Sequence, residues 1–115
     1  MDNREPPLYK AAYEFTLVAS RFVRDCHPAY KLTLGHSLQE KTLAMQAVIY
    51  QVNEHSDKVL ALQIALDRAY FIKMLLRLFL DMNLMKLETN ITLHGLLEDV
   101  TKQLHGWKKA QSIKS

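Results

Sequence analysis

The stretch AYFIKMLLRLFL, residues 69–80, decides the fold class of this 115-residue chain. Ten of its twelve residues are apolar, and the two exceptions, Lys73 and Arg77, are four positions apart and so share one side of a helix. A membrane span needs about 20 apolar residues, so this stretch is too short to be one. It therefore predicts the centre of a long helix over about residues 57–83, with Ser56 or Asp57 as its N-cap.

Two further helices are predicted on its N-terminal side. Apolar residues recur every three or four positions from Leu8 onward, which indicates a first helix over about residues 8–26 that Pro28 stops. A second helix is expected over about residues 33–55. Ser37 and Glu40 have the spacing of a capping box at its start, but an earlier start would place Gly35 inside its first turn.

A fourth helix is predicted over about residues 88–111, where Leu93 to Trp107 repeat in a roughly heptad pattern. The connection between the third and fourth helices is short, so these two should be antiparallel neighbours. Low glycine and proline content, at three residues each, also favours helix. We therefore expect residues 1–115 to form a single all-α domain, an antiparallel four-helix bundle with up-down-up-down topology.

Composition also indicates where the protein is located in the cell and which charge its partners carry. The only cysteine, Cys26, cannot form an internal disulfide, and the first residues, MDNREPP, lack the apolar run of a secretory signal. We therefore expect a cytoplasmic protein that does not enter a membrane. The net charge is +3, and residues 58–115 hold nine Lys and Arg against five Asp and Glu. This basic half favours an anionic partner, although C-terminal lysines also complement a helix dipole.

The third predicted helix is apolar around most of its circumference, more than one bundle core can cover. The surplus predicts an interface with another copy or a partner. The candidates for this interface are Tyr70, Phe71, Met74, Leu78 and Phe79.

The sequence offers little catalytic or metal-binding chemistry. Cys26 and His27 are adjacent without further ligands at metal-site spacing, and no pair of Glu-x-x-His motifs is present. Arg21 and His27 match the loose Arg-x4-6-His spacing of HEPN-type ribonucleases, a distant alternative because Pro28 follows directly and the helix ends between them. We expect no catalytic residues, no metal, no cofactor and no small-molecule substrate.

Three stretches carry a resemblance to a known family. They are YKLTLGHSLQ at residues 30–39, KMLLRLFLDMNL at 73–84 and LLEDVTKQLHGWKK at 96–109. With the pattern of the first helix, they resemble the four-helix-bundle family that contains Avd, the accessory variability determinant of diversity-generating retroelements. The family also contains proteins encoded in intervening sequences of bacterial 23S ribosomal RNA genes. The resemblance runs from about Leu8 to Lys109.

The resemblance implies a homopentameric barrel that binds the reverse transcriptase of the element and its template RNA or cDNA, and supports mutagenic copying without being an enzyme. It also implies a nucleic-acid role for Lys73 and Arg77, where the alternative is a local ion pair of Arg77 with Asp81. The basic C-terminal half adds Lys102, Lys108 and Lys109 to the expected nucleic-acid-binding residues. The chain is less basic than the better-known Avd. An intervening-sequence-type protein with no reverse-transcriptase partner is the main alternative.

Overall fold

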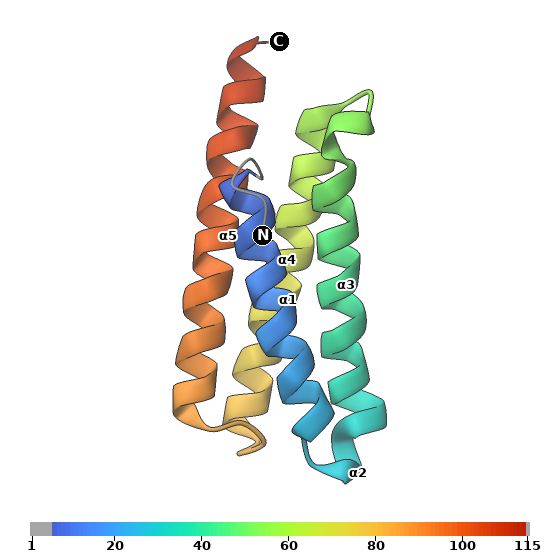
Figure 1. Cartoon of the computed structure of the whole chain (residues 1–115), viewed down its shortest axis with the longest axis vertical. Coiled ribbons are helices and arrows are strands. Elements are labelled where there is room, and N and C mark those ends of the chain that lie inside the picture. The colour runs from blue at the N-terminus through green and yellow to red at the C-terminus, as the bar shows by residue number, and fades with distance from the viewer. Residues whose placement is uncertain (1–5, 115) are drawn as a thin grey trace.

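Four long helices contain most of the residues that the computed structural model describes, which are residues 6–114 (Figure 1). The long helices are α1 (Pro7–Asp25), α3 (His36–Gln51), α4 (Lys58–Asp81) and α5 (Leu87–Lys114). Short pieces flank α3: the helical turn α2 (Pro28–Tyr30), the π-helical turn η1 (Lys31–Gly35) and the 3₁₀ turn η2 (Val52–Glu54). The four predicted helices are confirmed, and their ends differ from prediction by a few residues.

The long helices form an elongated bundle with extents of 47 × 27 × 20 Å. α1 and α4 are each packed between α3 and α5, so that consecutive helices are neighbours and α5 closes the bundle against α1 (Figure 1). The predicted antiparallel packing of neighbouring helices is therefore confirmed. None of the described helices has both the length and the apolar character that crossing a bilayer requires.

The start of the second predicted helix differs from the capping-box prediction. The chain turns at Pro28 and runs through α2 and η1 into α3 without a break, so Ser37 lies inside a continuous helical segment and cannot act as an N-cap. The earlier start, with Gly35 inside helix, is the correct alternative. A Cβ atom at Gly35 would lie 3.1 Å from the Cys26 sulfur, which explains why a residue without a side chain occupies this buried position.

Both ends of α4 are closed by local hydrogen bonds. At the start, the Asp57 carboxylate accepts from the backbone N–H of Leu60 at 3.0 Å, as the N-cap prediction required. At the end, Asn83 adopts a positive φ of 57°, and the N–H of Leu84 donates to the carbonyl of Phe79 at 2.8 Å. This is a Schellman motif, which turns the chain toward α5.

One continuous core runs along the bundle axis. Phe15 of α1, Met45 of α3, Phe79 of α4 and Leu97 of α5 are all fully buried in it. The Phe22 and Phe79 rings meet edge to face with centroids 5.2 Å apart. Burying a large apolar side chain contributes about 1.5–3 kcal/mol, so this core is the main stabilising feature of the fold.

Candidate functional site

The outward side of α4 carries large apolar side chains that the bundle does not cover. We call this side the α4 outer face, and its exposed members are Leu60, Tyr70, Phe71, Met74 and Met82. Leu60, in the first turn of α4, is 52% exposed, and Met74, in its second half, is 46% exposed, high values for such large apolar side chains. Leu78, predicted for the same surface, is half-buried.

Phe79 requires a correction, because it was predicted at an interface and is fully buried within the bundle instead. It lies on the opposite side of α4 from Met74 and packs on Phe22. The side chain therefore has no surface left for a partner. Of the five predicted interface residues, Tyr70, Phe71 and Met74 are exposed.

A groove between α3 and α4 borders the outer face on one side. It has a volume of about 280 Å³ and is lined by Lys41, Ile64, Asp67, Arg68 and Phe71. The Lys41 ammonium lies 5.6 Å from the centre of the Phe71 ring, within the range of a cation–π contact. Arg68 Nε is buried and has no hydrogen-bond partner within residues 6–114. This α3–α4 groove thus combines the apolar side chains of Ile64 and Phe71 with three charged residues, Lys41, Asp67 and Arg68.

A second groove, between α4 and α5, borders the outer face on the other side. It has a volume of about 440 Å³ and is lined by Tyr70, Lys73, Met74, Arg77, Leu80, Asn90 and His94. Its polar groups are mostly paired within the chain. Lys73 Nζ lies 2.7 Å from a Glu98 carboxylate oxygen, and the Tyr70 hydroxyl lies 2.8 Å from His105 Nε2. Arg77 lies 3.5 Å from Asp81, which is the local ion pair that the sequence offered as the alternative to a nucleic-acid contact.

These contacts perturb two titratable groups of the α4–α5 groove. The hydrogen bond and charge of Lys73 lower the pKa of Glu98. Burial, reinforced by the positive charge of Lys73, lowers the pKa of His94, while Glu98 acts weakly in the opposite direction. Lys73 therefore contributes to both shifts, because its positive charge favours the ionised Glu98 carboxylate and disfavours protonation of His94.

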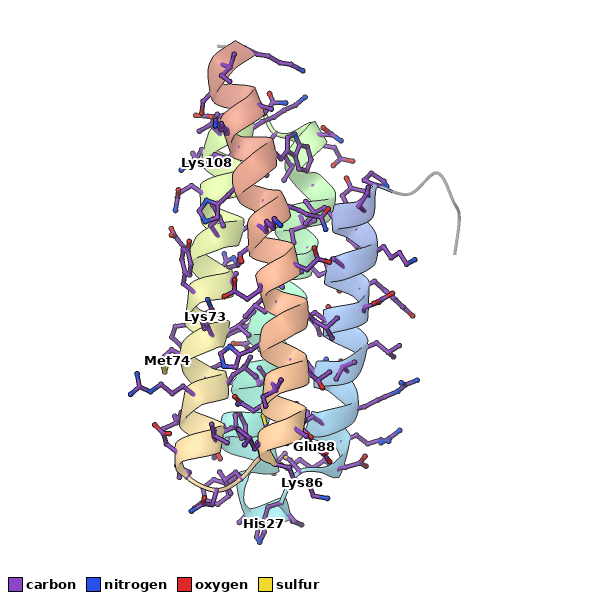
Figure 2. All side chains as sticks on the ribbon, turned by 90° about the vertical axis from the view of Figure 1, so that its left-hand side faces the viewer. His27, Lys73, Met74, Lys86, Glu88 and Lys108 are labelled. Carbon is purple, nitrogen blue, oxygen red and sulfur yellow. The ribbon has the colours of Figure 1, made fainter. Side chains whose placement is uncertain are left out.

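The five predicted nucleic-acid-binding residues fall into two groups. Lys73 and Arg77 hold acidic partners, and Lys108 donates to the Gln63 side chain across α4 and α5. Lys102 and Lys109 are exposed and have no ion pair with any residue in the described part of the chain. Figure 2 shows Lys73 at mid-height of the bundle and Lys108 farther along it, away from His27. The predicted residues therefore do not converge on one spot.

Sequence reasoning missed a cavity at the end of the bundle, which we call the end cavity. It has a volume of about 530 Å³ and brings Arg21 and His27 together with Lys86, which no sequence pattern had singled out. His27 Nδ1 accepts from the N–H of Ala29 at 3.0 Å and caps α2. Within residues 6–114 no hydrogen bond joins the Arg21 or His27 side chain to a hydroxyl or thiol, and no group of three His, Cys, Asp or Glu is placed to hold a metal ion.

No family model, no curated protein and no solved structure matches this chain.

Proposed function

We propose that this protein is a non-catalytic accessory protein of a diversity-generating retroelement. In this role it assembles into a homopentameric ring through the α4 outer face and binds the reverse transcriptase and the template RNA or cDNA. The family resemblance of residues 30–39, 73–84 and 96–109 supplies the identity of the partners. The chemistry of the surface supplies the reason to expect binding rather than catalysis.

The α4 outer face is the observation that carries this proposal. Phe71 and Met74 are each more than two-fifths exposed on a helix whose opposite side is fully buried. Exposed apolar patches of this kind mark interaction sites, because leaving them in water costs free energy that a partner surface recovers. The α3–α4 groove lies beside this row of exposed side chains. A helix of another copy could therefore pack against the row and place its own side chains in the groove.

The nucleic-acid part of the proposal is supported by cations on α4 and α5. Lys102 and Lys109 project from α5 without acidic partners in the described chain. Lys73 and Arg77 can also contribute, because each is paired with an exposed carboxylate. Such a pair is weak enough for the cation to exchange it for an ion pair with a phosphate. A ring would repeat each basic group, and weak phosphate contacts would then add through effective concentration. Binding of this kind tolerates any sequence and weakens steeply with salt.

Light scattering of the purified chain tests the assembly. We expect about five subunits for the wild type, and dissociation for a Leu60→Glu, Phe71→Glu double variant that places charge on the outer face. The matched control is Leu32→Glu, because Leu32 is 87% exposed but lies in η1, away from α4. A monomeric wild type at micromolar concentration would refute the proposed ring.

A gel-shift series with structured RNA at rising salt tests the nucleic-acid role. The Lys73→Glu, Arg77→Glu double variant should bind more weakly than wild type, whereas a Lys10→Gln, Lys31→Gln control should not.

Co-elution with a reverse transcriptase tests the proposed protein partner. A reverse transcriptase encoded beside this gene should co-elute with the purified protein on size exclusion, whereas a ribosomal intervening-sequence-type protein would have no reverse-transcriptase partner. Absence of such a gene from the locus would favour that alternative.

A further inference from the structure

The end cavity gathers polar side chains from three separate parts of the chain. Arg21 comes from the next-to-last turn of α1, His27 from the link to α2, and Lys86 and Thr89 from the α4–α5 connection and the first turn of α5. Figure 2 shows His27 and Lys86 at the same end of the molecule. Its volume of about 530 Å³ falls within the range of small-molecule sites.

The charge in this cavity is not balanced by the chain itself. Arg21 and Lys86 are exposed and form no ion pair or hydrogen bond with another side chain of residues 6–114. Asp25 is the single acidic residue lining the cavity, and Arg24 holds both of its oxygens at 2.9 Å. This pair largely cancels, which leaves two positive charges facing one space. Glu88 lines a neighbouring shallow hollow with Thr89 rather than this cavity.

Neutral hydrogen-bond donors and an apolar wall complete the site. Because His27 Nδ1 accepts the Ala29 N–H, the neutral ring carries its proton on Nε2, which is thereby left as a donor. Thr89 adds a hydroxyl to the lining. Phe22, Leu84 and Met85 supply apolar surface beside these groups, and the Phe22 ring is fixed by its edge-to-face packing on Phe79.

We infer that the end cavity binds a phosphate monoester attached to a flat, partly apolar body, as in a nucleoside monophosphate or the phosphorylated terminal nucleotide of an RNA strand. A monoester carries a charge of about −1.5 to −2 at pH 7, whereas each internal phosphodiester of RNA carries one negative charge. Two uncompensated cations match the monoester. Arg21 can engage two of its oxygens through the planar guanidinium, and Lys86 supplies a point charge. Binding of a phosphorylated RNA end rests on the proposed nucleic-acid function, whereas binding of a free nucleoside monophosphate is independent of it.

Calorimetric titration with adenosine monophosphate and with adenosine tests the phosphate itself. We expect the monophosphate to bind at least about tenfold more tightly, the effect of one or more charge-assisted hydrogen bonds. Arg21→Gln and Lys86→Gln should each remove most of this preference. Lys10→Gln is the matched control, because Lys10 is an exposed cation of the same helix α1 outside the cavity. Equal binding of the two compounds, or an equal loss in the control, would overturn the inference.

A second arm separates the two sources of the monoester and separates this inference from the proposed function. Short single-stranded RNA is compared with and without a terminal phosphate, at the 5′ and at the 3′ end. A terminal-phosphate preference that depends on Arg21 and Lys86 supports the RNA end as the ligand. Binding of the monophosphate without any RNA binding supports the nucleotide site and contradicts the proposed nucleic-acid role. RNA binding that ignores terminal phosphate, with no monophosphate binding, overturns the inference and leaves the proposed function standing.

Discussion

The inner and outer faces of α4 are built from similarly apolar residues but have opposite environments. The inner face carries Ala61, Ala65, Ala69, Ile72 and Phe79, all fully buried. The outer face carries Leu60, Tyr70, Phe71 and Met74, all more than two-fifths exposed. In the first half of α4 the buried positions alternate between alanines and the leucines Leu62 and Leu66, so large apolar side chains occur on both faces of this helix.

Apolar residues have a different role on each face of α4. Alanines on the inner face let neighbouring helices approach closely, because the distance between helix axes depends on the side chains between them. The large outer side chains contribute little to that packing. Their exposure in the single chain is the physical basis of the proposed assembly, because exposed apolar patches are typical of interaction surfaces.

The largest expected effect separates the two faces by stability. Phe79→Ala should destabilise the fold by about 3–5 kcal/mol, because it removes a buried ring and leaves a cavity beside Phe22. Phe71→Ala should cost at most about 1 kcal/mol, since its ring is partly in water and loses mainly the contact with Lys41. Urea unfolding of both variants at equal protein concentration measures the difference.

Equal losses in the two variants would break the comparison. They would mean that the outer ring is packed as firmly as the inner one in solution. A loss for Phe71→Ala that grows with protein concentration would instead locate its contribution at the interface between copies.

Helix positions could be predicted because periodicity and local signals act over a few residues. Asp57 lies three residues before the N–H that it caps, and Pro28 keeps the preceding His27 out of the helical conformation just after α1 ends at Asp25. The start of the second helix could not be fixed, since the Ser37–Glu40 signal competed with packing of Gly35 against Cys26. That contact joins two segments whose closeness only the folded bundle determines.

The candidate site was predictable only in part, for the same reason. Phe71 and Phe79 are eight positions apart, so a period of 3.6 residues puts them on one broad stripe of α4 and cannot tell that only Phe79 faces the core. The Arg77–Asp81 pair lies within one helix and was foreseeable, whereas Lys73 and Glu98 are 25 positions apart and meet only across α4 and α5. The end cavity is likewise formed by segments from both halves of the chain, so no local pattern revealed Lys86.

A smaller effect on stability is expected at the α5 side of the outer face, where Lys73 and Glu98 form an ion pair. Lys73→Gln and Glu98→Gln each break the same 2.7 Å ion pair, so the double variant should be no less stable than either single variant. The pair is largely in water, so its coupling should be small and should vanish in about 1 M salt, where charges are screened over roughly 3 Å. A double-mutant cycle in urea at low and high salt measures it. Coupling that persists at high salt would show that this flank is shielded from water, contrary to its exposure in the single chain.

The smallest expected effect concerns the pH dependence of stability through His94 in the α4–α5 groove. Burial and the charge of Lys73 lower its pKa in the folded state, while the unfolded chain keeps the ordinary value of about 6.5. Around and below that pH the unfolded state therefore binds more protons, and the free energy of unfolding falls as pH falls. His94→Gln should flatten this slope between about pH 7 and pH 5. The control His55→Gln removes an exposed imidazole before α4 and leaves the groove intact. Thermal unfolding across this pH range measures the slope. An unchanged slope in His94→Gln would mean that neither burial nor Lys73 lowers the pKa of His94 in the folded protein, and would contradict the prediction.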